Sequence, residues 1–340
     1  MVNFGSVSIK KVKTLTGLKR LIKSIPKSEV YLIKPNWYSP YPAGFTGSKA
    51  IGMLIDALPG PSIVIEGHSL DRQNGTKQYS VLGKKVDWKW LLKNPDWKWM
   101  EESNSMGELR RQEKWFLDTH GITETLENRG VDYLNITEEI WSGRSENPER
   151  VKNVLGNSHP PILRDKIYGF MPSKLARLKG NTLVSLCRVK GFGGRYPSLS
   201  IKNLFGLIPD PMRSWWHGVN DCDLSHNIID IARLYKAYFN LFGVCEAIDN
   251  FTVDNPEGEV KVPWGAYSVA YSEGFASCGS NLIELDAVLC NLIKVDPEKV
   301  GYICLGEGLL GEYNRVAVKK ASAFSGLFFN PKNVHLHDKS

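Results

Sequence analysis

The sequence predicts an α/β protein with a largely parallel, covered sheet that has helices on both faces, plus a Trp-rich helical insertion. Short β-rich runs alternate with segments of helical periodicity along most of the chain. The strand runs are continuously apolar, which is typical of parallel strands buried on both sides. The composition, with 42% hydrophobic and 23% charged residues, is that of an ordinary globular protein.

The alternation can be followed from one predicted element to the next. The predicted strands cover 30–33, 62–65, 131–136 and 182–187, and the predicted helices cover 49–58, 122–129, 227–239 and 285–293. Thr46 or Ser48 is the candidate cap of the first of these helices, and Gly130 is a natural stop for the second. Such a series predicts one integrated domain over residues 1–330.

The excess positive charge of the chain is confined to its start. The 340 residues have a net charge of +7, and residues 1–34 alone contain eight basic groups and one acidic group. Apolar residues at helical spacing over 15–25 predict a basic amphipathic helix that covers the sheet. The alternative is a surface that attracts anionic lipid, nucleic acid or an acidic partner. Because the rest of the chain is neutral, we do not expect nucleic acid to be the partner.

Residues 72–115 interrupt the strand–helix rhythm and are predicted to be an insertion. The tetrapeptide Asp-Trp-Lys-Trp occurs there twice, at 87–90 and 96–99. Its indoles either pack on the body of the protein or form a lid or partner surface, so residues 75–115 are the candidate protein-binding segment. We also predict a lobe boundary near 142–162 and a tail at 331–340.

The six cysteines are spaced too widely for a common metal motif. No Cys-x-x-Cys pair exists, so neither an iron–sulfur cluster nor a zinc ribbon is expected, and no metal ligands are assigned. The cofactor stays unknown. We find no apolar signal core and no run long enough for a transmembrane segment, and we predict a cytoplasmic protein.

Polar residues follow three predicted strands at the point where each strand ends. Ligands of open α/β sheets bind in the crevice beyond the carboxyl ends of the strands. We therefore take these residues as candidates for the site: Lys34, Asn36, Glu66, His68, Lys190 and Arg195. The glycines between Lys190 and Arg195 let backbone amides approach an anion. A plain glycine-rich turn is the alternative for that segment.

Three later segments add further candidates. Lys202 and Asn203 are polar residues within an apolar run, His217 follows two tryptophans, and Asp249 ends another strand pattern. Glu66 and His217 are the predicted acid–base pair, because a carboxylate and an imidazole can have separated pKa values. The other candidates are assigned to substrate binding. Purely structural roles remain the alternative for each residue: a solvated charge, a helix cap, a packed histidine or a helix surface.

Several of these segments together resemble the domain-of-unknown-function family numbered 362. The resemblance rests on Ile33-Lys34-Pro35-Asn36, Lys190, Lys202-Asn203-Leu-Phe-Gly206, His217, Ile248-Asp249 and Leu285-Asp286-Ala-Val, and it covers most of residues 28–310. It implies an α/β fold and a prokaryotic cytosolic protein, but it supplies no reaction. Lys190 is followed by Gly191-Phe192 where relatives often have Thr-His, and the appended cysteine-rich segments of many relatives are missing.

Two classes of function follow from these observations. The first is an enzyme that binds a small anionic metabolite, a carboxylate or a phosphate, in the crevice at the strand ends. The alternative is a non-catalytic binding or assembly module that uses the Trp-rich insertion and the basic N-terminal helix.

Overall fold

The computed structural model describes most of the chain. The described residues are 1–72, 80–81, 84–85, 93, 98, 100, 105–156, 160–191, 196–262, 265–272 and 274–328. The tryptophans of the two Asp-Trp-Lys-Trp segments, Arg195 and the predicted tail lie outside these ranges.

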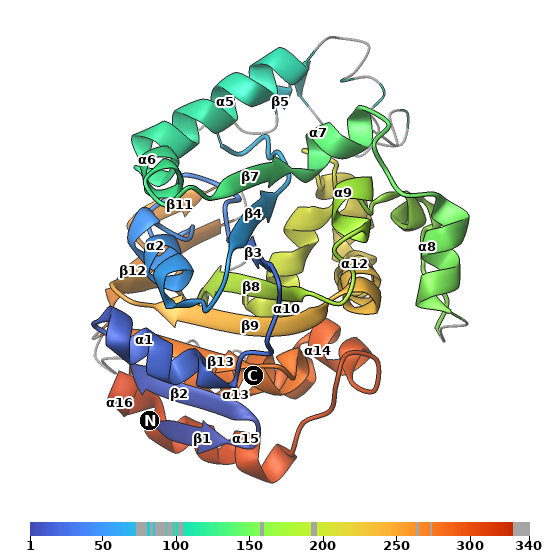
Figure 1. Cartoon of the computed structure of the whole chain (residues 1–340). Coiled ribbons are helices and arrows are strands. Elements are labelled where there is room, and N and C mark those ends of the chain that lie inside the picture. Colours follow the sequence, from blue (N-terminus) through green and yellow to red (C-terminus); the bar gives the residue numbers. More distant parts are fainter. Residues whose placement is uncertain are drawn as a thin grey trace.

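The core of the fold is an eight-stranded sheet with the order β1-β2-β13-β9-β8-β3-β4-β7. Its strands are β1 (Val2–Phe4), β2 (Val7–Lys11), β3 (Tyr31–Lys34), β4 (Ser62–Glu66), β7 (Asp132–Asn135), β8 (Thr182–Arg188), β9 (Asn240–Ala247) and β13 (Phe275–Gly279). The five strands from β9 to β7 are parallel, and β13, β2 and β1 extend the sheet in antiparallel fashion. The prediction of a largely parallel sheet is confirmed (Figure 1).

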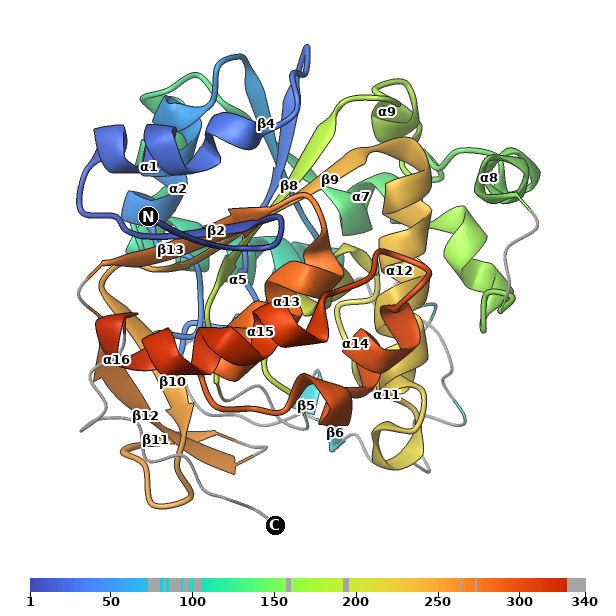
Figure 2. The ribbon, with the colours of Figure 1, turned by 90° about the horizontal axis from the view of Figure 1, so that it is seen from below.

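Both faces of this sheet are covered, as predicted. Neighbouring residues of one strand pack into two different apolar cores: Leu32 and Leu183 belong to one, and Ile33 and Val184 to the other. Side chains that alternate along a strand point to opposite faces, so the strands must be apolar throughout. Figure 2 shows helices on either side of the sheet.

The helices divide between the two cores. On one face lie α1 (Leu15–Leu21), α2 (Ser48–Ala57), α5 (Met106–Thr119) and α6 (Ile122–Glu127). On the other lie α7 (Ile136–Trp141), α8 (Pro148–Leu155), α9 (Ser173–Ala176), α10 (Ser200–Asn203), α12 (Leu224–Tyr238), α13 (Leu282–Leu292), α14 (Gly301–Gly306) and α15 (Arg315–Ala321).

Shorter elements complete the described fold. They are α11 (Ser214–His217), α16 (Ser325–Phe328), the 3-10 turns η1 (Ile22–Ser24), η2 (Asp165–Gly169), η3 (Leu204–Leu207), η4 (Val219–Asp221), η5 (Pro297–Lys299) and η6 (Ser322–Phe324), and the two-stranded sheet of β5 (Ser80–Val81) and β6 (Lys84–Lys85). A separate antiparallel sheet has the order β10-β12-β11, from β10 (Asn250–Asp254), β11 (Val260–Val262) and β12 (Gly265–Tyr271).

The strand and helix predictions are confirmed, with small shifts at the element ends. The proposed cap of α2 is wrong: Gly47 occupies that position without a side-chain cap, and the Thr46 hydroxyl instead contacts the backbone of Asn36 and Leu186. The segment 142–162, predicted as a lobe boundary, contains α8.

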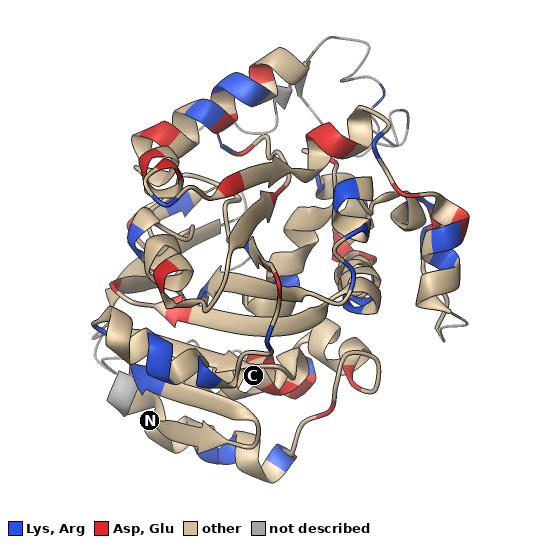
Figure 3. Ribbon diagram, viewed as in Figure 1, with Lys and Arg blue, Asp and Glu red and all other residues tan. Residues whose placement is uncertain are grey.

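The basic N-terminal helix has the predicted amphipathic form. Leu18 and Leu21 of α1 are buried against the sheet, whereas Lys19 and Arg20 are exposed. Figure 3 shows basic residues of α1 beside those of β2. Lys34, although counted in the same basic stretch, is fully buried. One of the eight cations therefore contributes nothing to that surface.

Candidate functional site

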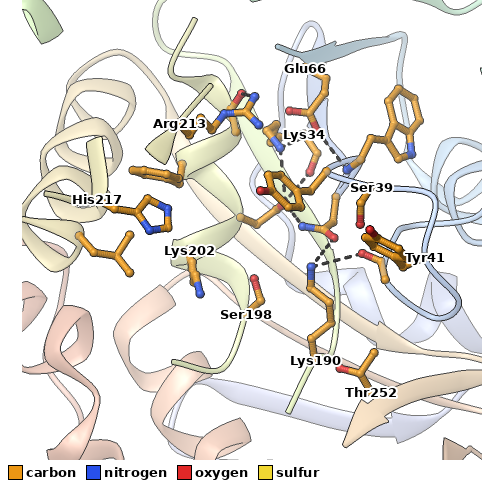
Figure 4. A pocket seen from close by; sticks show the side chains of 18 of the residues that line it. Lys34, Ser39, Tyr41, Glu66, Lys190, Ser198, Lys202, Arg213, His217 and Thr252 are labelled. Atoms are coloured by element: carbon orange, nitrogen blue, oxygen red, sulfur yellow. Dashed lines mark hydrogen bonds and ion pairs between the residues drawn. The ribbon is translucent and has the colours of Figure 1, made fainter. Parts of the chain in front are cut away.

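A cavity of about 280 Å³ opens at the carboxyl ends of the parallel strands. β3 lies between β4 and β8, so the chain leaves β3 toward one side of the sheet and later returns on the other. Such a switch in strand order is where α/β sheets form ligand crevices. Seven of the sequence candidates line this cavity: Lys34, Asn36, Glu66, Lys190, Lys202, Asn203 and His217 (Figure 4).

Lys34 and Glu66 form a buried ion pair at the base of the cavity. Lys34 ends β3 and Glu66 ends the adjacent strand β4, and their Nζ and Oε2 atoms lie 2.8 Å apart. Lys34 Nζ also donates to the Pro35 carbonyl at 2.7 Å. Burial lowers the pKa of Lys34 to about 8, and Glu66 opposes this effect because it favours the ammonium form.

Gly206 is packed directly against this ion pair. A Cβ atom at position 206 would lie 2.5 Å from Lys34 Nζ and 2.6 Å from Glu66 Oε1. Both distances are far below van der Waals contact, so a residue with a side chain cannot occupy this position unless the pair moves. The glycine of the Lys-Asn-Leu-Phe-Gly segment therefore has a packing role at the site.

Two asparagines connect the ends of β3 and β8. Asn36 Nδ2 donates to Asn203 Oδ1 at 3.2 Å, and Asn203 Nδ2 donates to the Lys34 carbonyl at 2.9 Å. Asn203 Nδ2 also contacts Ser185 Oγ of β8 at 3.0 Å. The two amides are buried, and their bonds fix the start of the loop after β3 against α10.

Lys190 extends from the segment after β8 toward Asn36. Its Nζ atom donates to Asn36 Oδ1 at 2.9 Å and to the Gly44 carbonyl at 3.3 Å. Backbone bridges to Ser198 and Thr252 fix the residue from both sides. Burial lowers the pKa of Lys190 to about 7, and the nearby cation Lys202 adds to that shift.

Lys202 and Arg213 supply two further cations. Lys202 Nζ donates to the Tyr196 carbonyl at 3.2 Å, and burial lowers the pKa of Lys202 to about 8. Arg213 donates from one terminal nitrogen to the carbonyls of His68 and Gly206, both at 3.0 Å. Its buried Nε atom has no partner among the described residues. Burial also lowers the pKa of Arg213.

His217 lies across the cavity from Lys190 (Figure 4). Its Nδ1 atom is 2.8 Å from Asp221 Oδ1, and both side chains are half-exposed. Asn220 and Asp221 both have left-handed backbone conformations, which Asn and Asp tolerate better than most residues. This turn brings the carboxylate back onto the imidazole and leaves the opposite ring nitrogen, Nε2, on the far side of the ring from Asp221.

Asp286 positions the segment that carries Lys202 and Asn203. It is fully buried in α13 and accepts hydrogen bonds from the backbone amides of Ser200, at 2.9 Å, and Ile201, at 3.0 Å. Burial raises the pKa of Asp286 to about 7, and these hydrogen bonds act in the opposite direction. These backbone donors supply the hydrogen bonds that a buried carboxylate requires.

The three-stranded sheet and the loop after β3 close the remaining side. Thr252 of β10 and Tyr267 of β12 line the cavity, and the Tyr267 hydroxyl donates to the Pro42 carbonyl at 2.8 Å. Ala43, in the same loop, has a positive φ of 55°. Non-glycine residues in this region are strained and often lie near functional sites.

Two of the predicted substrate-binding residues, His68 and Asp249, are not part of this lining. His68 is buried behind it, with Nδ1 3.4 Å from Glu113 Oε2 and Nε2 3.3 Å from Glu138 Oε1. Asp249 is half-exposed and pairs with Lys49 at 2.6 Å. Arg195 lies outside the described residues.

Three contributions to the site were not predicted from the sequence. They are Arg213, Asp221 as the partner of His217, and the aromatic side chain of Tyr267. Arg213 lies four residues before His217, in a loop whose path depends on tertiary packing. The local sequence does not mark Arg213 as a site residue, because a lone arginine after two prolines is typical of any surface loop. The Tyr267 contribution requires the β10-β12-β11 sheet, which the sequence analysis did not anticipate.

The described residues offer neither a metal cluster nor a membrane-spanning helix. Within the residues that the structure places, no group of three His, Cys, Asp or Glu side chains is arranged to hold a metal ion. None of the described helices is long and apolar enough to cross a membrane.

Comparisons with known proteins give one match. A family model described as "Domain of unknown function (DUF362)" matches residues 99–291, more than half of the chain. The matched range includes Lys190, Lys202, Asn203, Arg213 and His217. No curated protein and no solved structure matches the chain.

Proposed function

The chain belongs to the DUF362 family, whose description assigns no function, and from the cavity itself we propose that it is an enzyme that binds a small anionic metabolite. The ligand class is a carboxylate or a phosphate, and its site is the cavity beyond β3, β4 and β8.

The charge of the lining is the observation that carries this proposal. The described residues of the lining include four basic side chains, Lys34, Lys190, Lys202 and Arg213, and two acidic ones, Glu66 and Asp221. Glu66 neutralises Lys34, and Asp221 contacts His217. Lys190 and Arg213 form hydrogen bonds to neutral oxygen atoms in the described part of the chain. Desolvated cations of this kind gain free energy when an anion enters.

His217 is the better placed of the two acid–base candidates. Asp221 fixes the imidazole through Nδ1, and this arrangement orients a histidine for proton transfer through Nε2. Glu66 Oε2 is held by Lys34 Nζ and by the Trp37 amide at 3.2 Å. In this proposal Glu66 acts through Lys34, as a residue that positions the cation.

The alternative is an assembly module that uses the Trp-rich insertion and the basic N-terminal helix. Most of residues 75–115 lie outside the described ranges, and no contact among the described residues favours assembly over anion binding.

Isothermal titration calorimetry with inorganic phosphate and with pyruvate tests the proposal. We expect saturable binding of at least one anion by the wild type, and about tenfold weaker binding by K202M, since the loss of one charged partner costs about 1.4 kcal/mol or more. K174M is the matched control, because Lys174 is an exposed lysine on α9 away from the cavity. Equal affinities for wild type and K202M, or no saturable binding of either anion, would refute the proposal.

A further inference from the structure

We propose that Lys190 is a covalent catalytic residue that forms a Schiff base with a small carbonyl compound carrying a carboxylate or phosphate. This inference rests on the proposed function, because the anionic group is held by the same cavity. It assigns one lysine a nucleophilic role and narrows the substrate class to anionic aldehydes and ketones.

The hydrogen bonds of Lys190 match those of a neutral amine. A neutral amine has two N–H donors and one lone pair, whereas an ammonium group has three donors. Within the described residues, Nζ has two acceptors, Asn36 Oδ1 and the Gly44 carbonyl. The amine therefore keeps both bonds when it is neutral, and its lone pair remains available in the cavity that Lys190 lines.

Lys34, two residues before Asn36, shows the opposite arrangement. Its Nζ atom has three acceptors: Glu66 Oε2, the Pro35 carbonyl and, at 3.5 Å, Asn203 Oδ1. That set satisfies an ammonium ion and includes a carboxylate. Lys34 is thus held in its charged form, whereas Lys190 has no carboxylate among its described contacts.

The surroundings of Lys190 allow a substantial share of free amine at neutral pH, beside the ammonium form that attracts an anion. Burial and the neighbouring cations Lys202 and Lys34 all lower its pKa, which lies at about 7. A lysine that is desolvated or next to another cation is activated as a nucleophile in this way. The backbone bridges to Ser198 and Thr252 hold it in place for attack on a bound carbonyl.

The reaction balances without an oxidant or reductant. The lone pair of Nζ forms a bond to the carbonyl carbon as the C=O π bond breaks, and one Nζ proton passes to the oxygen to give a carbinolamine. His217 then donates a proton to that oxygen as the C–O bond breaks and water leaves. The remaining Nζ proton of the iminium returns to His217, which leaves the neutral imine. Lys202 and Arg213 are the cations that would bind the carboxylate or phosphate of the same molecule.

Reductive trapping with sodium cyanoborohydride at pH 7 tests the inference. The probes are pyruvate, glycolaldehyde phosphate and formaldehyde, of which the last needs no anion site. Peptide mapping by mass spectrometry should locate the reduced adduct on Lys190, formed at least about tenfold faster than on the exposed Lys174. K190R, which keeps the charge, should lose this adduct. In K202M the pH profile of Lys190 labelling should move to higher pH, because a neighbouring cation is removed.

The outcomes separate the two proposals. If pyruvate or phosphate binds in calorimetry but formaldehyde labels Lys190 no faster than Lys174, the Schiff-base inference is overturned and the anion site stands. Preferential adducts on Lys34 or Lys202 also overturn it. Rapid formaldehyde labelling of Lys190 without adducts from either anionic probe supports the nucleophile and contradicts the substrate class.

Discussion

The Lys34 ammonium group, at the end of β3, lies 2.8 Å from the Glu66 carboxylate, at the end of β4, and both side chains are at most 2% exposed. The two strands are adjacent and parallel, and each residue ends its strand, so both lie at the same edge of the sheet. The ion pair lies on one side of the cavity, and Lys190, Lys202 and Arg213 line the rest of it (Figure 4).

G206A should destabilise the protein by about 3 kcal/mol, because the new methyl group overlaps both partners of the ion pair. The free energy of unfolding in urea measures this change. G107A is the matched control, since Gly107 is exposed in α5 and an added Cβ would have no neighbour within 4 Å. That substitution should leave stability unchanged or raise it by up to about 1 kcal/mol. Similar effects of the two variants would contradict the packing role of Gly206.

The losses of stability caused by removing Lys34 and Glu66 should not be additive. The double variant should lose less free energy of unfolding than the sum of the two single variants. E66Q leaves the buried Lys34 ammonium without its carboxylate, and K34M leaves Glu66 with the more distant Arg72, at 4.0 Å, so each change should cost about 3–5 kcal/mol. The double variant K34M/E66Q leaves no such charge, so its loss should be smaller than the sum by at least about 1 kcal/mol. Urea unfolding of the four proteins gives this coupling energy. Additive effects would show that the two groups do not stabilise each other.

The free-energy cost of burying Lys190 should depend on pH. A lysine pKa lowered to about 7 means that, between pH 7 and about 10.4, the unfolded chain binds more protons than the folded protein. The cost is fully present below pH 7 and disappears as pH rises through that window. The stability gained by K190M relative to the wild type should therefore shrink from pH 6 to pH 9. An advantage that grows with pH would contradict the lowered pKa.

His68 should stabilise the protein more in acid than in alkali. Burial alone would lower its pKa, but Glu113 and Glu138 outweigh burial and raise it above 6.5. A raised pKa gives stability that is fully present below pH 6.5 and is lost as pH rises through the folded-state pKa. H68Q should accordingly cost more free energy of unfolding at pH 5.5 than at pH 8.5, with the exposed H226Q as control. A larger cost of H68Q at pH 8.5 than at pH 5.5 would mean that the folded protein favours neutral His68, and it would contradict the raised pKa.

Much of the fold could be predicted because the parallel strands are dictated by local sequence. The interiors of these strands, 31–33, 63–65 and 183–187, are apolar apart from Ser185, which few structures other than a covered parallel strand permit. The N-terminal hairpin of β1 and β2 was missed, since its residues alternate in burial and carry lysines. The β10-β12-β11 sheet was also missed, because short antiparallel strands depend on partners distant in sequence.

The candidate residues that end strands line one cavity, whereas His68 and Asp249, which lie in loops, are away from it. Lys34, Glu66 and Lys190 meet because parallel strands place their carboxyl ends on one edge. His68 follows the same strand as Glu66 but, two residues later, the chain has turned behind the cavity toward Glu113. Asp249 has likewise left the sheet and reached the surface. The path of the backbone after a strand depends on tertiary contacts, and a single sequence does not reveal these contacts.

The central claim is that this cavity holds a small anion. Its most direct test is native mass spectrometry of the protein purified from its own cells. The account predicts a non-covalent added mass of a small carboxylate or phosphate on the wild type, and its loss from the K190M/K202M variant purified in the same way. A wild-type spectrum without any such mass, or an added mass retained in full by K190M/K202M, would contradict it.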